Sequence, residues 1–299
     1  MELPKNHQFS SGTWSEQIRA ILREAVVQTS GTGWSLSDDD LSELELAKNS
    51  GIEQISTYFN NIIELSLKRR HNLSRFQNVD VLSLGFDCLG RTVPTRWGLK
   101  RPRCLGELSG PFDLAVHMPN TVSRLILQDF ECYLDPKNLH FDKSLGYCVD
   151  RELKISFNHE CGERFAVNNF EELIRVYQRR VEAFRKTLQT LAPLLFVAHL
   201  PPTMGVYKEQ LESLKSLLSF ISSRRSNKTA MLIIKTYNPG SEKPNAESFI
   251  DGQFCYHLVA NPWDNYVWYE PHCFMCRAGF EWEESIALQI ERVILSLMT

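Results

Sequence analysis

The chain has 299 residues, of which 43% are hydrophobic and 23% are charged, and its net charge at pH 7 is −3. This composition is typical of a globular protein that buries a large core, and the small negative charge argues against a nucleic-acid partner. The N-terminal residues lack the apolar core of a secretory signal, and the most apolar stretch, residues 191–200, is too short to span a bilayer. We therefore expect a cytoplasmic protein without a membrane partner, in which disulfides are rare.

The first 77 residues predict a helical region. Apolar residues recur at helical spacing in three stretches, residues 14–25, 41–44 and 52–63. Ser37 and Asp40 have the spacing of a capping box before the second stretch. The polar segment 69–78 has no periodicity and predicts a boundary. We expect an N-terminal helical region over residues 1–77 that is a candidate surface for a protein partner, followed by an α/β domain over residues 78–299.

Strand and helix patterns alternate from Val79 onward. A strand at 79–84 leads into a Pro- and Gly-rich stretch that predicts irregular structure, and then into a helix capped by Asn120. Further strands are predicted at 154–157, 194–198, 231–234 and 254–260, with helices at 168–191, 207–221 and 286–297. This alternation predicts an α/β fold with a Rossmann-like, mostly parallel sheet flanked by helices.

Cys88 stands just beyond the first predicted strand, which Gly85 ends. Side chains at the carboxyl ends of such strands lie where α/β proteins place ligands and nucleophiles. Asp113 follows a Gly-Pro-Phe turn, and His159 lies in the segment Phe-Asn-His-Glu. A thiol, an imidazole and a carboxylate are the three groups of a nucleophilic triad.

The same segments resemble a bacterial family of unknown function described as papain-like cysteine peptidases. The resemblance extends over roughly residues 79–235, with Leu114 and Glu160 replacing the usual Trp and Asp. It is carried by Ser83-Leu84-Gly85-Phe86-Asp87-Cys88, Arg96-Trp97-Gly98-Leu99, Pro111-Phe112-Asp113-Leu114 and Phe157-Asn158-His159-Glu160.

The resemblance implies a cysteine hydrolase: a peptidase, an amidase or an acyl-transfer enzyme. We expect Cys88 to be the nucleophile, His159 the base and Asp113 the group that orients the imidazole, with Arg96 binding an anionic part of the substrate. The substrate is then an unidentified peptide or small molecule, and no cofactor or metal is needed. The order Cys, Asp, His differs from that of papain, and we expect Pro94 to interrupt any helix that begins at Cys88.

Other interpretations remain open. His117 is a rival for the imidazole role. Asp113 caps a turn in the simpler structural interpretation, and Cys88 is then a buried apolar residue. The sheet also suits a sugar- or nucleotide-linked transferase, although no Gly-rich phosphate loop is present, and a non-enzymatic binding module is a third alternative. Asp264 with His272 is a weak esterase-like pair. A zinc site is a weaker alternative that would use Cys255, His257, His272, Cys273 and Cys276.

Overall fold

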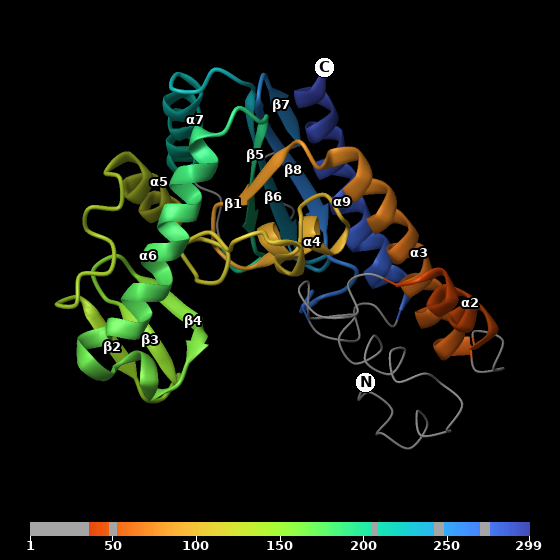
Figure 1. The fold of residues 1–299 in the computed structure, drawn as a ribbon, viewed down its shortest axis with the longest axis horizontal. Helices are drawn as coiled ribbons and strands as arrows, with labels where there is room; N and C mark the ends of the chain where they lie inside the picture. The colour runs from red at the N-terminus through yellow and green to blue at the C-terminus, as the bar shows by residue number, and fades with distance from the viewer. Residues whose placement is uncertain (1–35, 48–52, 205–207, 242–247, 270–275) are drawn as a thin grey trace.

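The computed structural model describes residues 36–47, 53–204, 208–241, 248–269 and 276–299 (Figure 1). The helix predicted at residues 14–25 lies outside the described residues. The next two predicted helices are present as α2 (Asp38–Ala47) and α3 (Glu53–Phe76). Helix α3 continues through the polar segment that predicted a boundary, because Arg69 and Asn72 there are buried and donate to backbone carbonyls of residues 96 and 97.

A five-stranded sheet forms the centre of the fold, with the strand order β1-β5-β6-β8-β7. Four of its strands are parallel, and the edge strand β7 is antiparallel to β8. The prediction of a mixed α/β fold with a mostly parallel sheet is confirmed. The strands are β1 (Asp80–Ser83), β5 (Leu194–Leu200), β6 (Thr229–Tyr237), β7 (Phe249–Asp251) and β8 (Phe254–Ala260).

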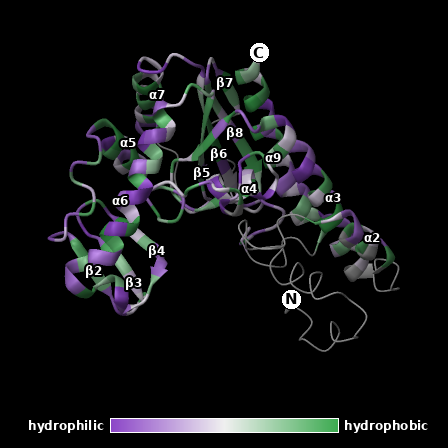
Figure 2. Cartoon of the chain, in the orientation of Figure 1, coloured by the Kyte–Doolittle hydropathy of each residue, from purple (hydrophilic) through white to green (hydrophobic). Residues whose placement is uncertain are grey.

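Helices cover both faces of this sheet (Figure 1). Helix α3 packs with α4 (Leu89–Arg96) and α9 (Arg277–Met298) on one face. The other face carries α5 (Pro119–Leu127), α6 (Val167–Gln189) and α7 (Lys208–Ser222). Every residue of β5 is buried, which explains the unbroken apolar run at residues 194–198. Figure 2 shows this contrast between hydrophobic strands and the mixed polarity of the helices around them.

A second, antiparallel sheet lies beside α6 and consists of β2 (Leu139–Asp142), β3 (Tyr147–Asp150) and β4 (Ile155–Cys161) (Figure 1). The strand predicted at 154–157 is therefore real, but it belongs to this small sheet and not to the central one. Short 3-10 turns occupy Arg103–Leu105 and Glu163–Phe165. Among the helices of the described ranges, none combines the length and apolar character needed to cross a membrane.

Two local predictions were wrong. Pro94 does not interrupt a helix after Cys88: Leu89–Arg96 form α4, with Cys88 at the N-cap and Pro94 inside the helix, and it is only the later part of the Pro- and Gly-rich stretch, residues 97–118, that is largely irregular. Pro94 removes one N–H donor from the helix, but backbone hydrogen bonds form on either side of it. Thr92 N donates to Cys88 O before the proline (2.8 Å), and Trp97 N donates to Val93 O after it (3.0 Å). Helix α5 starts at Pro119 after the N-cap Met118, so Asn120 is not its cap.

A buried ion pair joins α4 to α9. Arg96 and Glu283 are each 2% exposed, and Arg96 Nη1 lies 2.5 Å from Glu283 Oε2. The indole N–H of Trp97 donates to the other carboxylate oxygen at 2.8 Å. Arg69 of α3 donates to the Arg96 carbonyl at 2.6 Å, so three helices meet at this pair.

We predict that Glu283→Ala lowers the free energy of unfolding by about 3–5 kcal/mol, because it leaves the Arg96 guanidinium buried without its counter-ion. Denaturant titration measures the loss. Glu291→Ala is the matched control, since it breaks the exposed Arg75–Glu291 pair and should cost less than about 1 kcal/mol. Equal losses in the two variants would contradict this account.

Candidate functional site

The turn between β1 and α4 has an unusual backbone. Gly85 and Phe86 both have left-handed conformations, with φ of 84° and 75°. A side chain at Gly85 would also crowd His117, whose Cβ lies 3.2 Å from the position of an added Cβ. The turn leads to Asp87, whose Oδ1 accepts from Leu89 N at 2.9 Å at the start of α4.

Helix α4 approaches β5 very closely at Gly90. An added Cβ there would lie 2.7 Å from the carbonyl oxygen of Val197, so glycine is needed at this contact. Because the helix begins at the same turn, this approach sets Asp87 beside the carboxyl end of β5. The close packing at Gly90 therefore places the Asp87 carboxylate beside β5, the strand that carries His199.

Asp87, His199 and Thr236 form a hydrogen-bonded relay across three segments. His199 Nδ1 lies 2.7 Å from Asp87 Oδ2, and His199 Nε2 lies 2.9 Å from Thr236 Oγ1 on β6. A carboxylate only accepts, so Nδ1 carries a proton. In the neutral imidazole, Nε2 then accepts from the threonine hydroxyl. This is the order of contacts in a hydroxyl–imidazole–carboxylate triad.

The relay lies at a pocket of about 170 Å³. Its aromatic part includes Trp268, whose indole N–H lies 3.4 Å from Asp87 Oδ2. Asp87 is the one charged side chain among the described residues that line it. The complete lining is Asp87, His199, Pro201, Pro202, Thr236, Asn261, Tyr266, Val267, Trp268, Tyr269 and Trp282.

The four parallel strands each contribute a polar side chain to this pocket at or just past their carboxyl ends. Asp87 follows β1, His199 and Thr236 lie near the ends of β5 and β6, and Asn261 follows β8. Ligands of open α/β sheets bind outside these carboxyl ends. The pocket therefore has the position in which open α/β sheets bind ligands.

Lys235 supports one wall of the pocket. Its ammonium donates to the carbonyls of Pro201 at 2.7 Å and Met204 at 2.6 Å, in the segment that follows β5. The side chain is 3% exposed, and burial lowers its pKa to about 8. Lys235 thus orders Pro201 beside His199 and does not line the pocket itself.

The predicted nucleophile, Cys88, is partly buried at the N-cap of α4. Burial, followed by the negative charge of Asp87, raises the pKa of its thiol to about 11. Nearby Thr92 and Arg91 act in the opposite direction but do not outweigh these effects. The environment therefore favours the neutral thiol at pH 7 and gives no support to a thiolate nucleophile.

The predicted carboxylate, Asp113, is 1% exposed and binds other partners than a histidine. Its Oδ2 accepts from Gly110 N at 2.8 Å, as expected for the turn-capping alternative. The same oxygen lies 3.7 Å from Arg91 Nε and 3.8 Å from Lys100 Nζ. The Asp113 carboxylate thus caps a turn and offsets the positive charges of Arg91 and Lys100.

The predicted base, His159, lies on β4 of the small sheet and is exposed. Partial desolvation and the charges of Arg91 and Arg180 lower its pKa, while Glu160 acts to raise it. Arg91 is the neighbour common to the three predicted residues, since it pairs with Asp113 and also affects the pKa of Cys88. Within the described part of the chain, no hydrogen bond joins Cys88, His159 and Asp113 to one another.

Arg96, the predicted substrate-binding residue, is the buried partner of Glu283. Its guanidinium is held by the Glu283 carboxylate, so the side chain connects α4 to α9. The rival imidazole, His117, is completely buried between Ala115 O at 3.2 Å and the Tyr133 hydroxyl at 3.1 Å. Neither residue lines the pocket of the relay.

The zinc alternative stays untested. His272 and Cys273 lie outside the described residues, and among the described residues no group of three or more His, Cys, Asp or Glu side chains could hold a metal ion. Cys276 is the N-cap of α9, where its sulfur accepts from Gly279 N at 3.4 Å. Asp264 of the esterase-like pair accepts from Gly240 N at 2.7 Å, and its suggested partner His272 lies outside the described residues.

Comparisons of the chain with protein-family models, with curated proteins and with solved structures give no match. The resemblance to papain-like peptidases therefore depends on the motifs around Cys88, Asp113 and His159 alone. Sequence reasoning missed Asp87 and His199, although a signal was present. A histidine at the end of an otherwise apolar, buried strand is an unusual polar residue at the edge where ligands bind.

We predict that His117 makes stability depend on pH. Burial lowers its pKa from 6.5 to about 4, so below pH 6.5 the unfolded chain binds a proton that the folded chain does not. The free energy of unfolding should fall as pH decreases from 6.5 towards 4, by about 2 kcal/mol at pH 5. Denaturant titrations at pH 7 and 5 measure this, and His117→Gln should show the smaller change. The same change in both proteins would contradict the assignment.

We predict slow alkylation of Cys88. At pH 8 its neutral, partly buried thiol should react with iodoacetamide more slowly than the exposed Cys132 and Cys161. Mass spectrometry of peptides from timed samples measures the order of labelling. If Cys88 is labelled first, and His159→Ala removes that advantage, the result would contradict this prediction and support the Cys88–His159–Asp113 triad.

Proposed function

We propose that the protein is a hydrolase or acyl-transfer enzyme in which Asp87 and His199 form the general-base pair. The observation that carries the proposal is the Asp87–His199–Thr236 relay at an aromatic pocket on the carboxyl edge of the parallel sheet. The reaction class is the one that the Cys88 motifs predict. The proposal replaces Cys88, His159 and Asp113 by Asp87, His199 and Thr236 as the catalytic groups. The latter three are hydrogen-bonded to one another, whereas burial keeps the Cys88 thiol neutral.

The chemistry follows from the direction of the hydrogen bonds. Thr236 Oγ1 attacks the acyl carbon, and its proton passes to His199 Nε2. Asp87 stabilises the imidazolium that forms, because its carboxylate accepts from Nδ1. The leaving amine or alcohol takes the proton from Nε2 as its bond to the acyl carbon breaks. Attack by water, or by another acceptor, then releases the acyl group and restores Thr236.

The pocket limits the substrate to a small group. Its volume of about 170 Å³ and its aromatic walls suit a short acyl group or one uncharged side chain of a peptide. The same proposal takes the central sheet as Rossmann-like, because helices lie on both faces of its parallel strands, and places the reaction in the cytoplasm. No cofactor enters any step.

The test is hydrolysis of p-nitrophenyl esters and amino-acid p-nitroanilides by purified variants. We expect His199→Gln and Asp87→Asn to lower kcat/KM at least about 100-fold, because each removes the base or its orientation. The matched control His159→Gln, at an exposed residue, should keep wild-type activity. Loss of activity in this control with retention in His199→Gln would overturn the proposal in favour of the Cys88 arrangement.

A covalent probe identifies the nucleophile directly in the wild-type enzyme. A β-lactone or fluorophosphonate that inactivates the wild-type enzyme should be found by mass spectrometry on Thr236, and Thr236→Val should prevent the modification. Modification of Cys88 would show that the nucleophile has been assigned to the wrong side chain.

A further inference from the structure

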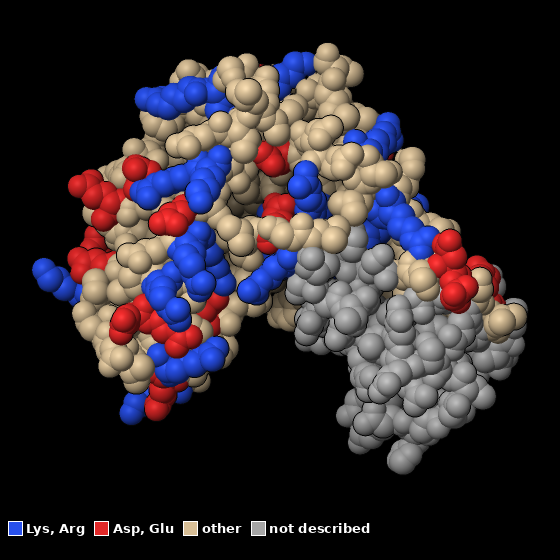
Figure 3. All heavy atoms as spheres, in the orientation of Figure 1, with Lys and Arg blue, Asp and Glu red and all other residues tan. Residues whose placement is uncertain are grey.

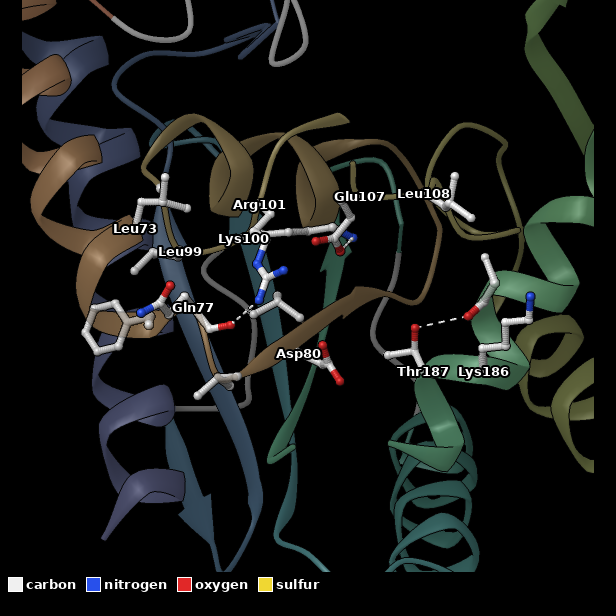
Figure 4. Close-up of a pocket in the computed structure, with 15 residues that line it drawn as sticks. Leu73, Gln77, Asp80, Leu99, Lys100, Arg101, Glu107, Leu108, Lys186 and Thr187 are labelled. Atoms are coloured by element: carbon white, nitrogen blue, oxygen red, sulfur yellow. Dashed lines mark hydrogen bonds and ion pairs between the residues drawn. The ribbon is translucent and has the colours of Figure 1, made fainter. Parts of the chain in front are cut away.

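A second cavity, of about 250 Å³, lies beside β1 and is separate from the pocket of the relay. In Figure 3 this face of the molecule is hollowed between α6 and β1, with charged side chains around the hollow. Figure 4 shows its walls: Gln77 and Arg101 lie on one side, Lys186 of α6 lies on the other, and Asp80 of β1 lies between them. None of the lining residues is used by the proposed reaction.

Asp80 brings to this cavity a carboxylate that has no counter-ion within the described residues. Its Oδ2 accepts from Thr190 Oγ1 at 2.6 Å, and no described donor bonds to its Oδ1. Asp80 also acts to raise the pKa of Arg225, but that guanidinium donates to backbone carbonyls at and beyond the end of α6. The other carboxylate of the cavity, Glu107, differs because Lys100 Nζ lies 3.3 Å from its Oε1.

Two cations at the rim of the cavity also form no ion pair within the described part of the chain. Arg101 and Lys186 are both exposed, and they lie on opposite walls in Figure 4. Arg101 donates to Gln77 O at 2.7 Å, which holds its guanidinium at the wall. Asp80 and these two cations therefore line the same hollow without contact between the opposite charges.

Opposite charges held apart across a cavity suit a small ligand that carries both signs. Its ammonium group can pair with Asp80, and its carboxylate with Arg101 and Lys186, through charge-assisted hydrogen bonds. Leu99 and Leu108 add apolar surface to the lining. Pockets for drug-sized ligands measure about 300–1,000 Å³, so a cavity of about 250 Å³ suits a smaller molecule. A free amino acid with an apolar side chain has all of these features.

We propose that this cavity binds a free L-amino acid with an apolar side chain, whose ammonium group pairs with Asp80 and whose carboxylate pairs with Arg101 and Lys186. Lys100 contributes indirectly, because it offsets the charge of Glu107 and leaves Asp80 as the carboxylate that attracts the ammonium group. The site is separate from the acyl-transfer chemistry proposed above, so its test does not depend on that reaction.

The test is isothermal titration calorimetry of the full-length protein with L-leucine, for which we expect one bound molecule per chain. Isopentylamine is leucine without the carboxylate, and 4-methylpentanoate is leucine without the ammonium group. Each should bind at least about tenfold more weakly than leucine, because each loses one charged pair. Absence of leucine binding, or equal affinity for the three compounds, would overturn the proposal.

Two sets of variants locate the site. Asp80→Asn should weaken leucine binding at least about tenfold, because its amide keeps an oxygen for Thr190 but loses the charge. Arg101→Gln combined with Lys186→Gln should weaken it as much, and these exposed positions give a test that does not depend on the folding of Asp80→Asn. The matched control is Glu131→Gln, at an exposed residue outside the cavity lining, which should bind as the wild type does. Wild-type affinity in both sets would show that leucine binds elsewhere.

Discussion

The buried contact between Arg96 and Glu283 is the constraint on which the rest of the fold around the pocket depends. It fixes α4 against α9, and both helices carry parts of the site. Helix α4 begins at the turn that presents Asp87, and Trp282, next to Glu283 in sequence, forms part of the pocket wall. Two charges removed from water cost free energy, and here three helices supply the compensating contacts. Glu283 also accepts from the Trp97 indole, so the pair is satisfied by more than charge.

Local patterns in the sequence predicted most of the helices and strands of the central sheet. Unbroken apolar runs at 194–198 and 231–234 indicated buried parallel strands, and helical spacing located α6, α7 and α9. These patterns could not predict the small sheet, because the local pattern of a strand such as β4 is the same whichever sheet the strand joins. Helix α4 was missed for a different reason: Pro94 argued against it, but tertiary packing at Gly90 and the Arg96–Glu283 pair outweigh the cost of one proline.

The site was predicted only in part. The sequence placed the site at the rim beyond β1, where Cys88 lies next to Asp87, and the relay that we propose as the site lies at the same rim. The partner of Asp87 was not predictable from spacing, because it depends on which strand lies beside β1. That strand is β5, and His199 is 112 residues from Asp87 in sequence. Asp113 and Arg96 have residue types suited to catalysis, but burial and ion pairing assign them to the structure of the turn and the helices. Burial, which decides between these roles, is not visible in a motif.

The pairing of β1 with β5 has a consequence for how the molecule folds. Between these two strands the chain forms α4, α5, the whole small sheet and α6. Closing so long a loop costs entropy that is recovered only when the strands have aligned, so formation of this pair is expected to be a slow, late event. The carboxylate and the imidazole come from the two sides of that junction. A chain halted at an earlier intermediate therefore contains Asp87, His199 and Thr236 and yet lacks the hydrogen bonds between them, so the proposed site forms only when β1 and β5 have paired.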